Sequence, residues 1–355
     1  MALADLTDGL TVLEQLAPRL RDYEPLDASW QQAEKHALAV RTQVEALLRS
    51  PEGVQQLRAS SALPQMKRLI LLIVREQVTR EDIAELSVQD FVLGLLFEKP
   101  YAVFAHVYRG YGPEYGKELS EEARKSSNII KSSFIYGEIL FFPFAEAIRY
   151  VAPFLPEHAV FYDLGSGTGK AVIAASLLHP FDQAVGIELL EPLVTCADKR
   201  KASLVKHQGN TYTDIEFIEG SLLSTKWENG DVVFCHGTCF NDQYVLNRIS
   251  IHNGVTGERL MGSLLEWAQI SLSAENLKQG AFFLSTSHVL QTALFEVVKS
   301  VQFKMSWGTA TLYIHRRRKI GRWAAQMLRG GRATRTDLVD SQAGSAAAKT
   351  DETRD

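Results

Sequence analysis

Cysteine is scarce in this sequence, and long apolar runs are absent. The 355 residues contain three cysteines, at positions 196, 235 and 239, which is too few for a disulfide-stabilised scaffold and is consistent with a reducing compartment. Cys235 and Cys239 resemble half of a metal site, but no second Cys/His pair stands at zinc-finger spacing, so no metal is predicted. The strongest apolar run, Leu69 to Val74, is far shorter than the roughly twenty residues of a membrane span.

Neither sign of charge is in large excess. Lys+Arg total 38 against Asp+Glu 42, a net charge of −4, which excludes a globally basic nucleic-acid binder. The first ten residues carry acidic and no basic side chains, unlike a secretory signal peptide. With 46% hydrophobic and 23% charged residues, the chain can bury a full core. We therefore expect a soluble, intracellular protein with no membrane partner.

The residue pattern changes twice along the chain and divides it into three parts. Residues 1–125 read as helical, because leucines recur at three- and four-residue spacing from Leu6 to Leu16, and further helices are expected over 28–48, around 66–78 and from Thr79 onward. Residues 126–318 are expected to form the second domain, in which β and α patterns alternate from about 155 to 316. Residues 319–355 form a tail that is first basic and then, over the last twenty residues, small, polar and expected to be disordered. The first part reads as a helical bundle packed on the second, although it could also hold a partner protein.

The second part predicts a mixed sheet with helices on both faces. Repeated βα units give parallel neighbouring strands, and two strand-like runs around Gly308 predict a terminal antiparallel hairpin. The expected strands cover residues 160–164, 183–190, 215–218, 231–235, 281–287, 301–307 and 309–315, and the expected helices cover residues 170–178, 192–207 and 259–277.

A glycine-rich turn joins the first expected strand to its helix, in Asp163-Leu164-Gly165-Ser166-Gly167-Thr168-Gly169-Lys170. Glycines let the backbone turn sharply and approach a ligand, and the helix start offers free N–H groups. The spacing differs from the dinucleotide fingerprint, and Ala171 stands where a phosphate-binding P-loop has Ser or Thr. Glu188 ends the second strand, where a carboxylate can accept both hydroxyls of a ribose. This combination indicates an S-adenosylmethionine site; the alternative is a structural turn with a surface glutamate.

Four further segments are similar to one family in order along the chain. Tyr136-Gly137-Glu138 resembles the Tyr-Gly-Glu element of the disruptor-of-telomeric-silencing (Dot1-type) family, the non-SET histone H3 lysine methyltransferases. Residues 220–227 resemble the family's segment after the third strand. Val232-Val233-Phe234 with Phe240 is similar to its fourth-strand motif, and residues 306–315 to its closing hairpin. The resemblance covers about residues 136–315.

The resemblance implies a class I S-adenosylmethionine-dependent methyltransferase, a Rossmann-like α/β fold with a seven-stranded mixed sheet, preceded by the helical region. In the family, the Tyr-Gly-Glu loop closes over the methionine end of the cofactor, and Glu138 is expected near the sulfonium. A less polar channel would lower the pKa of the acceptor lysine and let it lose its proton. The implied cofactor-binding residues are Tyr136, Gly137, Glu138, Asp163, Gly165, Ser166, Gly167, Gly169, Lys170, Glu188, Glu219, Ser221 and Leu222. The implied catalytic residues are Tyr136, Glu138, His236, Thr238, Phe240 and Tyr313, with Trp307 and Asn241 as further members of the channel.

The sequence departs from the family pattern at three positions. Ser221 stands where an acid would face the adenine, and Glu219 is an alternative partner for that group. Gly237 takes the place of the catalytic-loop asparagine, beside His236, and Leu312 replaces a tyrosine. The altered channel residues keep a second interpretation open, methyl transfer to a non-histone protein, an RNA or a small molecule. A third interpretation is a cofactor-binding or nucleosome-binding protein without catalysis.

A basic segment follows the closing hairpin. Residues 316–335 hold eight cations and no acid, beginning with Arg316, Arg317, Arg318, Lys319 and Arg322. These side chains either form a solvated tail or contact DNA phosphates. The family uses a comparable stretch on nucleosomal DNA, so the resemblance implies histone H3 in nucleosomes as the partner, lysine-79 as the acceptor and the nucleus as the location.

Overall fold

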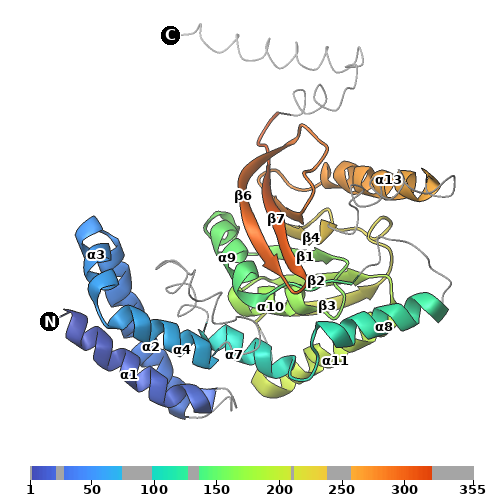
Figure 1. The fold of residues 1–355 in the computed structure, drawn as a ribbon. Coiled ribbons are helices and arrows are strands. Elements are labelled where there is room, and N and C mark those ends of the chain that lie inside the picture. Colours follow the sequence, from blue (N-terminus) through green and yellow to red (C-terminus); the bar gives the residue numbers. More distant parts are fainter. Residues whose placement is uncertain are drawn as a thin grey trace, which may run out of the picture.

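The computed structural model describes residues 2–20, 28–73, 98–126, 136–208, 212–237 and 257–321. These residues form a helical region and a single mixed sheet flanked by helices (Figure 1). None of the described helices is both long enough and apolar enough to cross a membrane.

The sheet has seven strands in the order β3-β2-β1-β4-β5-β7-β6. All neighbouring pairs are parallel except those of β7, which runs antiparallel to β5 and β6. The first strand lies near the middle, so the chain order reverses between β1 and β4, and the carboxyl ends of the strands there form a crevice. The strands are β1 (Val160–Leu164), β2 (Gln183–Glu188), β3 (Asp214–Glu219), β4 (Val232–Cys235), β5 (Phe282–Thr286), β6 (Phe295–Met305) and β7 (Gly308–Arg317).

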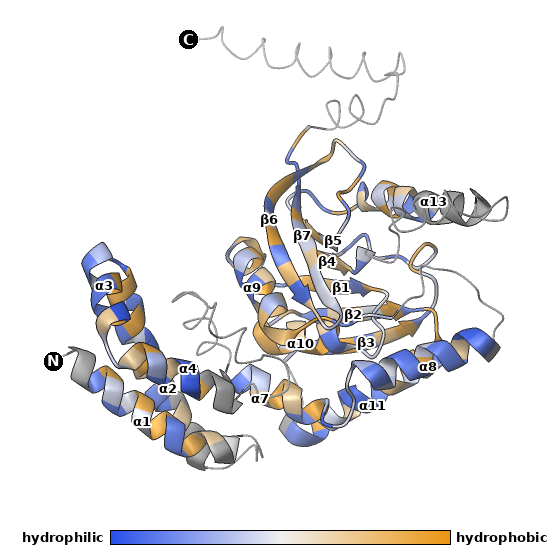
Figure 2. Ribbon diagram, in the orientation of Figure 1, coloured by the Kyte–Doolittle hydropathy of each residue, from blue (hydrophilic) through white to orange (hydrophobic). Residues whose placement is uncertain are grey.

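Alternating side chains of the central strands enter two different cores. Phe161 belongs to the core shared with α9 (Phe141–Val151) and α10 (Lys170–Leu178), whereas Tyr162 belongs to the core that includes Trp267 of α13 (Gly257–Ala274). Burial on both faces explains why these strands are almost wholly apolar, and Figure 2 shows them chiefly in the hydrophobic colour. Helix α11 (Glu191–Gln208) packs on β3 and on α8 (Pro113–Ser126).

The first four helices pack on one another and lie to one side of the sheet, next to α7 (Figure 1). They are α1 (Ala2–Leu20), α2 (Ala28–Leu48), α3 (Pro51–Ala59) and α4 (Ala62–Ile73), and α7 covers Glu98–Val107. The leucine stripe that predicted α1 is buried over its whole length, from Leu6 to Leu16. Helix α7 contacts α10 and α11. The helix expected from Thr79 lies outside the described residues.

The predicted α/β fold with a terminal hairpin is confirmed, and two elements differ from expectation. Helix α9 was not predicted; Pro143 lies in its first turn, where the missing N–H does not interrupt the hydrogen-bonding ladder. Strand β6 begins six residues before the expected start at Val301. A register shift between Val297 and Lys299 interrupts the alternation of side chains there, so residues 295–300 do not show the period of two on which the prediction relied.

Candidate active site

The glycine turn adopts a backbone that most other residues would avoid. Gly165 and Gly169 both have left-handed φ angles, of 85° and 83°. A Cβ on Gly165 would meet no atom within 4 Å, whereas a Cβ on Gly169 would lie 2.5 Å from Cζ of Phe217. Gly165 therefore faces open space at the pocket, and Gly169 lets α10 pack closely against the sheet.

Glu188 connects the end of β2 to this turn. One carboxylate oxygen accepts a hydrogen bond from Gly167 N at 2.9 Å, and the other accepts from Leu189 N and Leu190 N at 2.9 and 3.0 Å. Burial raises the pKa of the Glu188 carboxyl, while these three hydrogen bonds act in the opposite direction. Glu188 thus fixes the shape of the turn as well as lining the pocket.

Asp163, on β1, also lines the pocket and is buried. Burial, followed by the nearby charge of Glu188, raises the pKa of Asp163 to about 8 from its ordinary value of 3.8. The free energy that such a group contributes to folding is fully present below about pH 4 and is lost as the pH rises through 8, because only the unfolded chain releases the proton readily.

We therefore expect ligand-free protein to lose stability between pH 5.5 and 7.5, by about 1.4 kcal/mol per pH unit for one proton. Urea unfolding at both pH values would measure this loss. Asp163→Asn, which cannot ionise, should flatten the dependence; an unchanged slope in that variant would contradict the assignment to Asp163.

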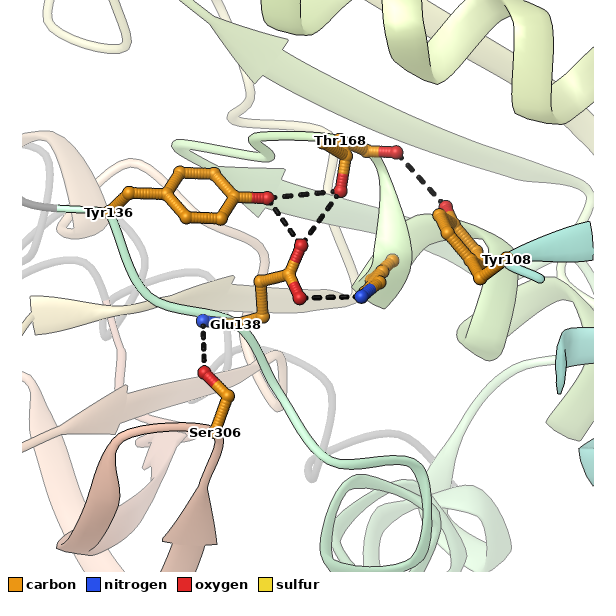
Figure 3. A network of polar contacts seen from close by, with 6 residues as sticks. Tyr108, Tyr136, Glu138, Thr168 and Ser306 are labelled. Carbon is orange, nitrogen blue, oxygen red and sulfur yellow. Dashed lines mark hydrogen bonds and ion pairs between the residues drawn. The ribbon is translucent and has the colours of Figure 1, made fainter. Parts of the chain in front are cut away.

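A buried polar network closes one side of the pocket (Figure 3). Lys170 Nζ lies 2.5 Å from one Glu138 oxygen, and the other oxygen accepts hydrogen bonds from the Tyr136 hydroxyl at 2.5 Å and the Thr168 hydroxyl at 3.1 Å. Tyr108 donates to the Thr168 carbonyl at 3.0 Å. Burial and the adjacent carboxylate raise the pKa of Tyr136 well above its usual value, so the phenol keeps its proton.

This network gives Glu138 a structural role, and its expected place near a sulfonium stays a prediction. Both carboxylate oxygens are already engaged by protein donors, and the Glu138 amide donates to Ser306 Oγ at 3.1 Å. The Tyr136-Gly137-Glu138 segment is consequently tied to α10, to the glycine turn and to the β6–β7 turn. Glu138 acts as a positioning residue within this network.

His236, which directly follows β4, also lines the pocket. A Cβ on Gly137 would lie 2.8 Å from His236 Cε1 and 2.8 Å from Trp307 Cδ1, so the glycine allows these two rings to approach the loop. The ring centroids of His236 and Trp307 are 6.0 Å apart. Trp307 is 46% exposed, so an exposed aromatic ring lies next to the pocket residue His236.

The structure brings most of the predicted cofactor residues to one pocket. Three predicted residues are placed elsewhere: Gly169 packs against Phe217, Glu219 is exposed at the end of β3, and Tyr313 lies on β7 opposite Ser285 and Ser300. Of the two alternatives for the adenine, Ser221 lines the pocket and Glu219 does not. Thr238, Phe240 and Asn241 lie outside the described residues. The predicted residues that line the pocket are Tyr136, Gly137, Glu138, Asp163, Gly165, Ser166, Gly167, Lys170, Glu188, Ser221, Leu222 and His236.

Sequence reasoning missed several lining residues. Thr168 stands within the glycine turn, where it reads as a spacer between two glycines, although its hydroxyl reaches Glu138. Ser120, on α8, lines the pocket from a helix that carries no motif. Ile139 and Met305 both line it, and an isolated antiparallel bridge joins Ile139 to Met305 at the end of β6. No sequence signal identifies these last three.

The first residues of the basic segment differ in their surroundings, which corrects one prediction. Arg317 is buried, and its guanidinium donates to the carbonyls of Leu294 and Glu275, at 3.3 and 3.1 Å; it holds the hairpin to the domain and does not face DNA. The Arg316 guanidinium lies over the rings of Phe154 and Phe282. Arg318 and Lys319 are exposed, and Arg322 lies outside the described residues.

The pocket fits S-adenosylmethionine in its donor set. Its ionisable lining residues include four carboxyl groups, Glu138, Asp163, Glu188 and Glu266, and one cation, Lys170. Glu138 is paired with Lys170, and Asp163 holds its proton below about pH 8, so Glu188 and Glu266 supply the acid that suits a ligand with a sulfonium and an ammonium group. Ser166 Oγ is buried and has no hydrogen-bond partner in the part of the chain that the structure describes. Open space above Gly165 allows close approach to the turn.

Comparison with known proteins supports this interpretation. Residues 120–250 match the family described as histone methylation protein DOT1, and no curated protein matches the chain. Among solved structures, similarity is found to the putative methylase HI0767 of Haemophilus influenzae, at 15% identity and a TM-score of 0.30 over 50% of this chain and 88% of that one. A putative class I S-adenosylmethionine-dependent methyltransferase of Listeria monocytogenes is 11% identical, with a TM-score of 0.34. The match covers 76% of this chain and 90% of that one. The family match, rather than these distant likenesses, confirms the predicted resemblance and supports the cofactor.

Proposed function

Because residues 120–250 match the DOT1 histone methylation family and the pocket is that of an S-adenosylmethionine-dependent methyltransferase, we propose that this protein methylates lysine-79 of histone H3 in nucleosomes. The observation that carries the proposal is the Tyr136-Gly137-Glu138 segment, packed against the glycine turn at the pocket. A histone acceptor implies that the protein works in the nucleus.

The roles of the chain's own residues follow from their positions. Glu188 and the glycine turn would hold the adenosine part, and Ser221 and Leu222 line the pocket beyond β3. Asp163 and Lys170 would face the charged amino-acid part. The cofactor supplies an activated methyl group; the protein excludes water and holds the acceptor amine in line with that group.

Transfer of labelled methyl groups tests the proposal. Purified protein would be incubated with labelled S-adenosylmethionine and, separately, with nucleosomes, free histones, total RNA or no acceptor. We expect label on nucleosomal H3, and loss of that label when arginine replaces the acceptor lysine of H3. Label on another acceptor would establish a methyltransferase with a different substrate, and cofactor binding without transfer would establish a non-catalytic binding protein.

We also propose that Arg318, Lys319 and Arg322 contact nucleosomal DNA. Two of them, Arg318 and Lys319, are exposed at the end of the catalytic domain. Residues 316–335 contain no acid, and Arg318 has an exposed ion pair with Glu296 at 3.5 Å. Replacing all three by glutamine should weaken nucleosome binding and reduce the slope of log affinity against log salt by about 0.9 for each phosphate that is no longer neutralised.

The matched control removes the same charge from other exposed positions, with Lys117→Gln, Lys125→Gln and Lys206→Gln. If both triple variants lower the slope equally, general charge rather than this segment mediates binding.

A further inference from the structure

His236 lines the cofactor pocket next to an exposed aromatic ring. It follows the last residue of β4, lines the pocket and approaches Gly137 on one side. The half-exposed ring of Trp307 lies next to it. The imidazole therefore lines the pocket with its centroid 6.0 Å from that of an exposed aromatic ring.

The imidazole carries an unused hydrogen-bonding atom. His236 Nε2 is buried, and it has no hydrogen-bond partner among the residues that the structure describes. A buried polar nitrogen without a partner is costly, and such atoms are uncommon in folded proteins. This nitrogen thus marks a place where a ligand group with an N–H or O–H would gain a hydrogen bond.

The surroundings of His236 keep its ring neutral. Burial lowers the pKa of His236 to about 4. The titratable groups that line the same pocket nearby are Glu138, which is paired with Lys170, and Glu266 on α13; the neighbouring Trp307 and Trp267 rings carry no charge. At pH 6–9 the ring is neutral, and a neutral imidazole nitrogen without a proton is a hydrogen-bond acceptor.

We propose that Nε2 of His236 accepts a hydrogen bond from an N–H of the acceptor amine and so orients the nitrogen lone pair for methyl transfer. The proposal rests on the proposed methyltransferase function and names the residue that would position its amine substrate. It makes His236 a catalytic residue in contact with substrate.

The chemical step is balanced without a proton on His236. The acceptor ammonium first releases its proton to water. The amine lone pair then forms the C–N bond as the S–C bond breaks, and the electron pair of that bond returns to sulfur. A ring with a pKa of about 4 is too weak a base to take the ammonium proton, so its part is orientation alone.

Two variants separate a hydrogen-bond acceptor from mere bulk. His236→Phe keeps a ring and removes the nitrogen, while His236→Gln removes the ring and offers an amide oxygen at similar reach. We expect the phenylalanine variant to lose about tenfold in kcat and the glutamine variant to remain within about threefold of the wild type, with the acceptor that the wild type labels. Calorimetry would measure the affinity of both variants for S-adenosylmethionine, so that kcat is compared at a saturating cofactor concentration, and melting temperatures would confirm folding.

A readout independent of turnover completes the test. In protein labelled with 15N-histidine, the His236 signal should report a neutral ring from pH 6 to 9. The Nε2 resonance should shift when butylamine, a mimic of the lysine side chain, is added with S-adenosylhomocysteine. Wild-type kcat in His236→Phe, equal losses in both variants, or an unmoved Nε2 resonance would each overturn the proposal. A wild type that labels no acceptor would instead overturn the proposed function, and the resonance would still decide the role of Nε2.

Discussion

Replacing Lys170 by methionine is expected to lower the free energy of unfolding by about 3–5 kcal/mol. The side chains of Lys170 and Glu138 are only 10% and 3% exposed, and their charged atoms lie 2.5 Å apart. Methionine fills similar volume but leaves the Glu138 carboxylate buried without its cation. Urea unfolding would measure the loss.

The design of the experiment isolates the ion pair from other effects. Lys170→Met combined with Glu138→Gln should be less destabilised than Lys170→Met alone, because the amide needs no counter-charge and still accepts from Tyr136 and Thr168. Arg318→Met is the surface control: its pair with Glu296 is 3.5 Å long and 44% and 45% exposed, so we expect a loss below about 1 kcal/mol. Equal losses in the two single variants would show that the buried pair has no special role.

Gly169→Ala is expected to cost about 3 kcal/mol of unfolding free energy, from two sources. The left-handed φ of 83° strains any residue with a Cβ, by about 1–2 kcal/mol. The new methyl group would also lie 2.5 Å from Phe217 Cζ and 3.0 Å from Ala197 Cβ, which adds the cost of overpacking.

Gly165→Ala is the matched comparison, since it shares the strain without the clash. Its φ is 85°, and no atom lies within 4 Å of the added Cβ. We expect a loss of about 1–2 kcal/mol in stability and at least a tenfold loss of S-adenosylmethionine affinity by calorimetry, because the methyl group would enter the pocket. Undiminished affinity would mean that the cofactor does not approach this turn.

Patterns that are local in the chain explain the parts of the fold and of the site that were predicted correctly. The leucine spacing of α1, the apolar runs of β1 and β4 and the glycine turn before α10 are each encoded within about ten residues. Local backbone preference and side-chain periodicity act at that range. Glu188 was predicted from a pattern of the same range, because it stands at the end of the apolar run that forms β2.

The roles of polar side chains depended on partners that are distant in sequence. Glu138 became a positioning residue through Lys170 and Thr168, about thirty residues away. Arg317 belonged by sequence to a basic run, yet it is buried because the carbonyls of Leu294 and Glu275 receive its guanidinium. A charge pattern alone cannot distinguish a solvated arginine from one that is held by carbonyl groups.

The sequence by itself determined the parallel strands, the glycine turn and the resemblance of the motifs to one family, since these follow from residue type and spacing. The tertiary structure alone decided which carboxylates are available to a ligand, that Ser221 rather than Glu219 lines the pocket, and that Nε2 of His236 is buried beside Trp307. The physical reason is that burial and hydrogen bonding, which set the charge state and reactivity of a polar group, arise only when distant segments pack together.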